Sequence, residues 1–260
     1  MPRTLKLTIA YDGTRFVGWQ RQSEGESIQG LLETALARFE GAPVVVHGAG
    51  RTDSGVHALA QAASVTLSGA HPLDAIVRAL NAQLPRDVRV LDAAEAPPEF
   101  HARFDARGKA YRYLIRTGAI ASPFDRGYVW HVPETLDLDR MRSAARRLVG
   151  THDFAAFQSA GSHTRSSHRT ITASDVSVVP APMFNSIDSA AIAPLLSYEV
   201  HGDGFLRHMV RAITGTLVDI GRGWRPDTIA DLLRGGVRAA AGPTAPAHGL
   251  YLVRVDYDWH

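Results

Sequence analysis

The fold is decided by the stretch Leu5-Lys6-Leu7-Thr8-Ile9-Ala10-Tyr11, which begins a series of alternating strands and helices. Apolar and polar residues alternate along it with a period of two, which is typical of a half-buried strand, and Asp12-Gly13 is a turn signal directly after it. Ser27 is then expected to cap a helix, because apolar residues recur at helical spacing from Ile28 to Phe39.

The rest of the first half continues in a strand-helix-strand-strand-helix-strand order. Short strands are expected at 44–46, 62–67 and 88–91, with a helix beginning at Pro72. This order is the split arrangement of ferredoxin-like folds. The second half repeats it less clearly, with strands expected at 109–117, 171–179, 195–200 and 250–257, and helices at 138–148, 205–220 and 226–233. We therefore predict an α+β protein with two halves, 1–105 and 106–260, and loops at 155–169 and 180–194.

The composition excludes several classes of protein. Hydrophobic residues make up 45% of the chain and charged residues 21%, which is ordinary for a globular protein. No apolar run approaches the roughly 18 residues of a membrane helix, and the start of the chain does not resemble a secretory signal, so a cytoplasmic protein is expected. Cysteine is absent, which excludes disulfides, thiolate zinc sites and cysteine nucleophiles. The twelve histidines form no paired metal-ligand motif, so no metal site is predicted.

Arginine dominates the basic residues. The chain has 28 Lys+Arg, of which only Lys6 and Lys109 are lysine, leaving 28 − 2 = 26 arginines. Arginine binds phosphate bidentately and stacks on bases, which favours an RNA partner. A genome rich in arginine codons would give the same bias, and the abundant alanine agrees with that alternative.

The segment most informative about function is Gly48-Ala49-Gly50-Arg51-Thr52-Asp53-Ser54-Gly55-Val56-His57-Ala58. Its glycines allow tight turns and close approach of a ligand. It matches neither a dinucleotide fingerprint nor a phosphate loop, because Asp53 stands where a third glycine would be and no Lys-Ser/Thr pair follows. What remains is a carboxylate displayed on a constrained loop, two positions after Arg51. A plain turn aspartate before Ser-Gly explains the same pattern.

Two further segments carry candidate binding residues. In the strand Lys109-Ala110-Tyr111-Arg112-Tyr113, alternation places Lys109, Tyr111 and Tyr113 on one face, where they would stack a base and hold a phosphate. Packing in the core is the alternative. In the predicted helix 205–220, Arg207 and Arg211 would lie one turn apart and favour an anion between them, unless they form a solvated basic face.

Together and in this order, these segments resemble the tRNA pseudouridine synthase A family. The similarity spans nearly the whole chain, from Tyr11-Asp12-Gly13 to a final Gly249-Leu250-Tyr251-Leu252-Val253. Its most specific part is Arg51-Thr52-Asp53-x-Gly-Val-His-Ala, and it also includes Phe100-His101-Ala102-Arg103-Phe104 and Tyr111-Arg112-Tyr113.

The resemblance implies two ferredoxin-like or RRM-like halves that share a long, mainly antiparallel sheet with a central basic cleft. It implies a homodimer without cofactors that converts uridines 38, 39 and 40 of the tRNA anticodon stem-loop to pseudouridine. It assigns Asp53 as the catalytic carboxylate, Tyr111 as the residue stacked on the base, and Arg211 as its ionic partner. Leu250 would form an apolar wall, and Arg51 would assist extrusion of the base. Lys109 and Arg207 are further candidates for binding the substrate.

This chemistry needs an ionised carboxylate as nucleophile and neither a redox cofactor nor a metal. The carboxylate would attack C6 of the base or C1′ of the sugar, or stabilise a cationic sugar while C2′ loses a proton. Two other functions compete with this one. A non-catalytic RNA-binding protein would explain the arginines and aromatic residues, although an acid in the glycine loop would repel phosphate. A metal-dependent hydrolase would use the histidines.

Overall fold

The computed structural model describes residues 2–159, 161, 164, 166–180 and 194–258, and the chain divides into two compact units. Unit 1 comprises the chain up to Lys109 together with the segment from Tyr251 onward, and unit 2 comprises Ala110–Leu250. Both units mix helices with a mainly antiparallel sheet, so the predicted α+β class is confirmed.

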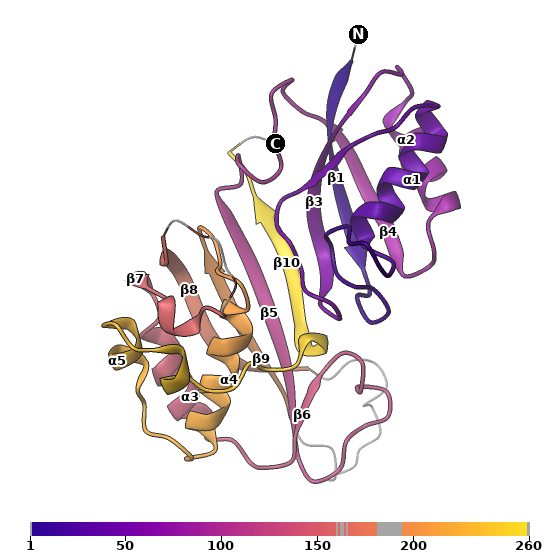
Figure 1. Ribbon diagram of the computed structural model, residues 1–260. Helices are drawn as coiled ribbons and strands as arrows, with labels where there is room; N and C mark the ends of the chain where they lie inside the picture. Colours follow the sequence, from indigo (N-terminus) through magenta and orange to yellow (C-terminus); the bar gives the residue numbers. More distant parts are fainter. Residues whose placement is uncertain (1, 160, 162–163, 165, 181–193, 259–260) are drawn as a thin grey trace. The chain divides into compact units, whose positions relative to one another are not determined.

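Unit 1 has the strand and helix order that the sequence predicts. The elements are β1 (Arg3–Tyr11), α1 (Ile28–Glu40), β2 (Val46–Gly48), β3 (His57–Leu67), α2 (Leu73–Gln83) and β4 (Val88–Glu95). The strands are arranged in the order β4-β1-β3, and β2 pairs with β3. β1 is antiparallel to both of its neighbours. In Figure 1, α1 and α2 lie together on one face of these strands.

The core of unit 1 follows from the alternation along β1. Leu5, Leu7 and Ile9 are fully buried, whereas the residues between them are largely less buried. On α1 the buried residues recur at helical spacing, and the hydroxyl of Ser27 accepts a hydrogen bond from the backbone N–H of Gly30 at 3.2 Å. This is the cap that the sequence predicts, and it satisfies one of the free N–H groups of the first turn.

The last strand, β10 (Leu250–Asp256), corrects the predicted domain boundaries. The sequence assigned residues 106–260 to the second half, but the segment from Tyr251 onward belongs to unit 1. The physical reason is that β10 pairs in parallel with the start of β3, with Tyr251 opposite His57 and Leu252 opposite Ala58. Parallel partners are joined by long connections, so no local sequence signal links these two strands.

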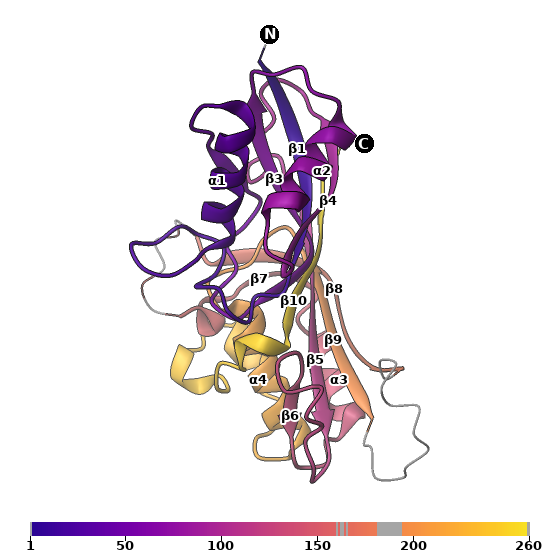
Figure 2. The same cartoon turned by 90° about the vertical axis from the view of Figure 1, so that its right-hand side faces the viewer.

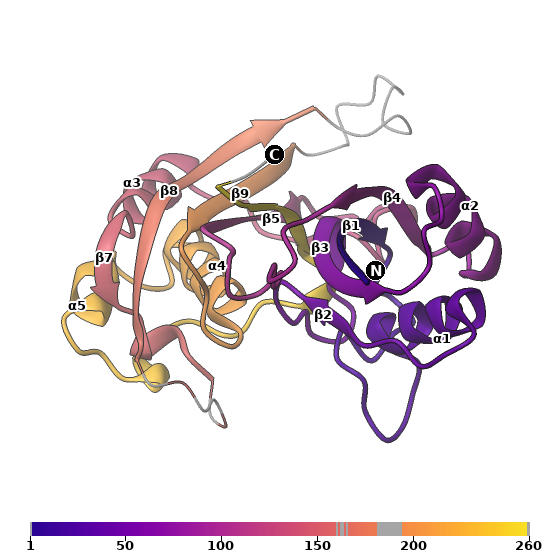
Figure 3. The same ribbon diagram turned by 90° about the horizontal axis from the view of Figure 1, so that it is seen from above.

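Unit 2 contains β5 (Gly108–Thr117, in this unit from Ala110), β6 (Trp130–Val132), α3 (Leu138–Arg146), β7 (Gly150–Asp153), β8 (His168–Val179), β9 (Leu195–Gly202), α4 (Met209–Gly221) and α5 (Ile229–Leu233). The strand order is β5-β9-β8-β7, and β6 pairs with β5. Short 3-10 turns occur at Ala155–Phe157, Arg238–Ala240 and Ala247–Gly249. Figures 2 and 3 show α3 and α4 beside β8 and β9. The sequence did not predict β6 and β7, which are too short to show a periodic pattern.

The start of α4 differs from its prediction. The sequence placed a helix at 205–220, but α4 begins at Met209 because His208 has a left-handed backbone with φ of 60°. Arg207 therefore precedes the helix, and it does not lie one helical turn from Arg211 as predicted. In the predicted loops 155–169 and 180–194, residues 160, 162–163, 165 and 181–193 lie outside the described part of the chain. None of the helices in the described part has the length and hydropathy to cross a membrane.

Candidate functional site

The Asp53 loop, residues 49–56, connects β2 to β3 in unit 1. Its two ends, Ala49 and Val56, are buried, and Asp53 between them is half-buried. The backbone N–H of Val56 donates to the carbonyl oxygen of Asp53 at 3.1 Å, and Gly55 supplies the positive φ of 78° that this turn requires. The loop therefore holds the Asp53 carboxylate at a tight turn immediately before a long strand.

A neighbouring segment supports the backbone of the Asp53 loop. Trp19 donates its backbone N–H to the carbonyl oxygen of Thr52 at 3.1 Å, and the Ser54 hydroxyl donates to the carbonyl oxygen of Phe16 at 3.0 Å. Gly18 has φ of 110°, and a Cβ atom there would lie 2.6 Å from the Thr52 carbonyl oxygen. Only glycine therefore permits this approach.

A buried hydrogen-bond chain fixes the residue just before Asp53. The hydroxyls of Tyr11 and Thr52 lie 2.8 Å apart, and the Gln61 amide donates to the Tyr11 hydroxyl at 3.4 Å and to the carbonyl oxygen of Gly50 at 2.9 Å. Tyr11, Thr52 and Gln61 are all buried. Burial raises the pKa of Tyr11 to about 12, so its hydroxyl keeps its proton at neutral pH. Because buried polar groups lose much by losing a partner, this chain resists distortion of the loop.

His57, just after the loop, is held beside the turn that follows β1. Its Nδ1 lies 3.1 Å from the backbone nitrogen of Gly13 and 3.2 Å from Oδ1 of Asp12. The ring stacks on Tyr251 of β10 with centroids 4.8 Å apart, and it is almost fully buried. This end of the loop is therefore packed against the strand that completes unit 1.

The two remaining basic candidates of unit 1 lie at the loop or near it. Arg51 is exposed. Lys109 is half-buried, and a methyl group at Gly50 would lie 3.4 Å from its Nζ atom. The structure thus brings the Lys109 ammonium to the same loop that carries Arg51 and Asp53, which the strand pattern of 109–113 did not indicate.

In unit 2, the two tyrosines of β5 have different environments. Tyr113 is fully buried, its hydroxyl donates to the carbonyl oxygen of Pro246 at 2.7 Å, and its ring contacts the backbone of Gly249 closely enough to exclude a side chain there. Burial raises the pKa of Tyr113 well above its usual value. Tyr111 is 9% exposed and meets the ring of Phe205 edge to face at 5.0 Å. Tyr113 is thus a core residue, and Tyr111 keeps part of its surface accessible.

The other candidates of unit 2 lie on α4, shortly before it, or at the first residue of β10. Nε of Arg211 donates to the carbonyl oxygen of Ala245 at 2.7 Å, and the backbone N–H of Ala245 donates back to the carbonyl oxygen of Arg211 at 3.1 Å. Leu250 follows this segment and is nearly buried. Arg207 is exposed, and its backbone carbonyl accepts the N–H of Ser159 at 3.2 Å. Arg211 and the 245–250 segment are therefore fixed to one another.

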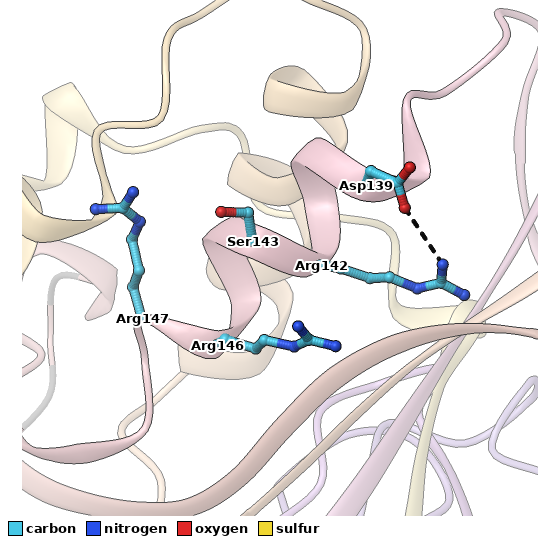
Figure 4. A pocket seen from close by; sticks show the side chains of 5 residues that line it. All are labelled: Asp139, Arg142, Ser143, Arg146 and Arg147. Carbon is cyan, nitrogen blue, oxygen red and sulfur yellow. Dashed lines mark hydrogen bonds and ion pairs between the residues drawn. The ribbon is translucent and has the colours of Figure 1, made fainter.

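A hollow on α3 contains none of the predicted site residues. It is lined by Asp139, Arg142, Ser143, Arg146 and Arg147 (Figure 4). Each of its arginines is near a carboxylate: Arg142–Asp139 at 3.4 Å, Arg146–Asp175 at 3.9 Å and Arg147–Asp227 at 2.9 Å. These pairs balance the positive charge, so the hollow is not a strong anion site. In the described residues, no group of three or more His, Asp or Glu side chains is arranged to hold a metal.

The sequence did not indicate the residues that support the Asp53 loop. Tyr11 and Gln61 fall in predicted strands or next to them, and the sequence pattern gives no role to Gly18. A usable signal was present for Gln61, because it is the one polar residue in the stretch from Ala58 to Ala63. Polar side chains at inward positions of a strand need buried partners, which indicates a hydrogen-bonded network.

Comparison with known proteins gives a consistent result. The pattern of a family described as tRNA pseudouridine synthase matches residues 7–105 and 144–258. A protein of Pelobacter propionicus named tRNA pseudouridine synthase A is 46% identical over 98% of this chain and 100% of its own length. Proteins with the same name from Syntrophotalea carbinolica and Myxococcus xanthus are each 44% identical, over 97% and 99% of this chain and 96% and 92% of their own.

Proposed function

The chain belongs to the tRNA pseudouridine synthase family, and on this basis we propose that it isomerises uridine to pseudouridine in tRNA. The proposed targets are uridines 38, 39 and 40 of the anticodon stem-loop. The proposed active form is a cytoplasmic homodimer that requires no cofactor. The targets, the dimer and its location are inferred from the family resemblance.

Asp53 is proposed as the nucleophile, and the rigidity of its loop is the observation that carries this proposal. The reaction breaks the bond between N1 and C1′ and joins C5 to C1′, while C5 loses a proton and N1 gains one. Because all of these changes occur within one nucleotide, an oriented carboxylate is the main requirement. The Tyr11–Thr52 hydrogen bond and the close packing of Gly18 hold the backbone on the N-terminal side of Asp53. A plain surface turn would not need a buried polar network beneath it.

The other site residues receive roles from the resemblance. Tyr111 is proposed to stack on the target base, and Leu250 to form an apolar wall of the pocket. Arg211 is proposed to pair with Asp53, which favours the charged form of the carboxylate. A uridine in a stem must leave its stack to react, which costs a few kcal/mol. Arg51 would offset this cost by contacting the RNA, and Lys109 and Arg207 would do so by contacting phosphates.

The test of the proposed function is to map pseudouridine on unmodified tRNA after incubation with the purified protein. Wild-type protein is expected to modify uridines at positions 38, 39 and 40, and an Asp53→Ala variant to modify none of them. A protein that binds tRNA but forms no pseudouridine would instead be a non-catalytic RNA-binding protein. Product at other positions would keep the activity and overturn the proposed target.

Removing the Tyr11 hydroxyl is expected to reduce catalysis without weakening tRNA binding. Tyr11→Phe removes the buried partner of the Thr52 hydroxyl, whereas Gln61 keeps its hydrogen bond to the carbonyl oxygen of Gly50, so we expect a loss of about 1 kcal/mol in the free energy of unfolding. The loosened Asp53 loop should lower kcat by about three- to tenfold, whereas KM for tRNA stays near the wild-type value. Single-turnover kinetics and denaturant unfolding measure the two effects.

Tyr198→Phe is the matched control, because Tyr198 is also a fully buried tyrosine whose hydroxyl lies 3.1 Å from that of a buried serine, Ser174. It lies on β9 of unit 2, and its hydroxyl pairs with Ser174 of β8. It should lose similar stability and keep the wild-type kcat. Equal losses of kcat in the two variants would show that only general stability is involved.

Arg211→Lys is expected to lower kcat by about 10- to 100-fold. Lysine keeps the charge, but it lacks the planar fork and the Nε donor that Arg211 directs to Ala245. Arg112→Lys is the control, because it changes a partly exposed Arg112–Glu199 pair of 2.8 Å on β5, where such pairs contribute little. Wild-type rates for Arg211→Lys would remove this residue from the proposed ion pair.

A further inference from the structure

Three rings contact one another in series, each tilted against the next, on the surface of unit 1, and we refer to His47, His101 and Phe104 as the ring ladder. The ring centroids of His47 and His101 lie 4.8 Å apart at 30°, and those of His101 and Phe104 lie 4.3 Å apart at 33°. The guanidinium of Arg103 lies 5.7 Å from the centroid of Phe104. Two of these rings belong to the segment Phe100–Phe104, to which the family resemblance gives no role.

The outer ring of the ladder is displayed to solvent. Phe104 is 72% exposed, and His47 is also exposed. A single exposed apolar residue is common on protein surfaces and needs no explanation. An exposed phenyl ring that contacts a second ring and has a guanidinium beside it is a more specific arrangement, because its exposed surface can stack on a flat ligand.

The turn that carries Phe104 is anchored on both sides. The backbone N–H groups of Phe104 and Asp105 donate to the carbonyl oxygen of His101, each at 3.1 Å, and the backbone N–H of His101 donates to the Asp105 carboxylate at 2.8 Å. Ala102 between them is fully buried; its N–H donates to the Ser64 hydroxyl at 3.1 Å, and its carbonyl accepts the Tyr257 hydroxyl. The backbone that carries the exposed ring is therefore held in place, so binding of a ligand would not require this turn to become ordered.

The ladder is built on the residues that begin the Asp53 loop. His47 lies on β2, directly before this loop. Phe100 and Ala102 pack in one apolar cluster with Ala49, the first residue of the loop, and with Ala62 of β3. The surface formed by the ladder and the proposed catalytic loop are thus parts of the same packed region of unit 1.

The rings of the ladder are suited to a neutral, flat ligand. Nδ1 of His101 accepts the backbone N–H of Arg103 at 3.1 Å, which leaves a proton only on Nε2 of a neutral ring. Burial, and after it the charge of His47, lowers the pKa of His101, so this ring is uncharged at neutral pH. Nucleic-acid bases stack on such rings without preference for sequence, and a nearby arginine adds attraction.

We propose that the ring ladder is a stacking surface for an unpaired base of the tRNA substrate. This inference rests on the proposed function, since it names a contact made by the same substrate. RNA is favoured over a protein partner because the charged side chains of Arg103 and Asp105 flank Phe104, whereas a protein-docking surface would need a wider apolar patch. The contact would hold the RNA beside the Asp53 loop, and it would not take part in the chemistry.

The experiment compares the tRNA affinity of three Phe104 variants at one fixed salt concentration. Phe104→Ala and Phe104→Leu should each bind tRNA about tenfold more weakly, because loss of one stacked base typically has this effect. Phe104→Trp should bind at least as tightly as wild type, because a larger flat ring replaces the first. KM for tRNA should rise with the dissociation constant. The dependence of log K on log salt should keep its slope, because no phosphate contact is lost.

Phe124→Ala is the matched control, because Phe124 is a similarly exposed phenylalanine (67%) in unit 2. It should bind tRNA like wild type. Equal binding by wild type and by both the Ala and Leu variants would overturn the proposal, as would a change of oligomeric state with unaltered tRNA affinity. The two proposals can fail separately. If the wild-type protein forms no pseudouridine but the Phe104 variants bind tRNA more weakly than it does, the proposed function is refuted and the ring ladder remains a binding surface for RNA.

Discussion

Replacing Asp53 by asparagine is expected to abolish pseudouridine formation, with a loss of at least about 10⁴-fold in kcat. Asparagine has nearly the same shape as aspartate, and the substitution leaves the backbone hydrogen bond from Val56 to the carbonyl oxygen of residue 53 in place. The loop should therefore persist while the negative charge of the proposed nucleophile is lost. The dissociation constant for tRNA should change less than about threefold, as measured by equilibrium titration. Product would be measured in single-turnover reactions.

An Asp53→Ala variant should accompany this one, because hydrolysis of a small fraction of asparagine would regenerate aspartate. The control is Asp74→Asn, which removes a carboxylate from an exposed pair with Arg78 on α2 of unit 1. Such pairs contribute little to stability, so this variant should remain active. Turnover by Asp53→Ala above the background without enzyme would exclude Asp53 as the nucleophile.

Gly18→Ala is expected to have the second largest effect, because it forces the backbone beside Asp53 to move. The new Cβ would lie 2.6 Å from the carbonyl oxygen of Thr52 and 3.1 Å from the carbonyl carbon of Asp53, and both contacts are with backbone atoms that cannot rotate away. A displacement near 1 Å at a reacting group can cost about 100-fold in rate. We expect a loss of this size in kcat, and a loss of about 2–4 kcal/mol in the free energy of unfolding.

Gly41→Ala separates backbone strain from displacement of the loop. Gly41 ends α1 with φ of 74°, and a Cβ atom there would have no other atom within 4 Å. This variant should lose about 1 kcal/mol of stability from the left-handed backbone alone and keep its kcat. Full activity in folded Gly18→Ala protein would show that the segment 16–19 does not position Asp53.

The order of elements in unit 1 could be predicted because each element carries its own local signal. β1 alternates between buried and less buried residues from Leu5 to Tyr11, and α1 has both a serine cap and an apolar stripe. These features depend on residues within one element, and local preference and burial agree there.

Predictions failed where one residue changed the backbone or where partners lie far apart in the sequence. The apolar residues Phe205, Met209 and Ile213 have helical spacing, but His208 adopts a left-handed conformation that no pattern indicates, and the helix starts after it. β10 has a clear strand pattern, but its partner β3 is distant in the chain. Within the candidate site, Asp53 stands out by its motif, whereas Tyr11 and Gln61 support it through contacts made only in the folded sheet.

The parallel pairing of β10 with β3 has a consequence for biosynthesis. On the ribosome, the first six elements of unit 1 emerge before any of unit 2, but Tyr251 and Leu252 emerge only after all of it. Until then the edge of β3 at His57 and Ala58, beside the Asp53 loop, lacks its final partner. Exposed strand edges pair with other chains. The nascent enzyme is therefore open to aggregation at this edge until β10 has been translated and pairs with β3.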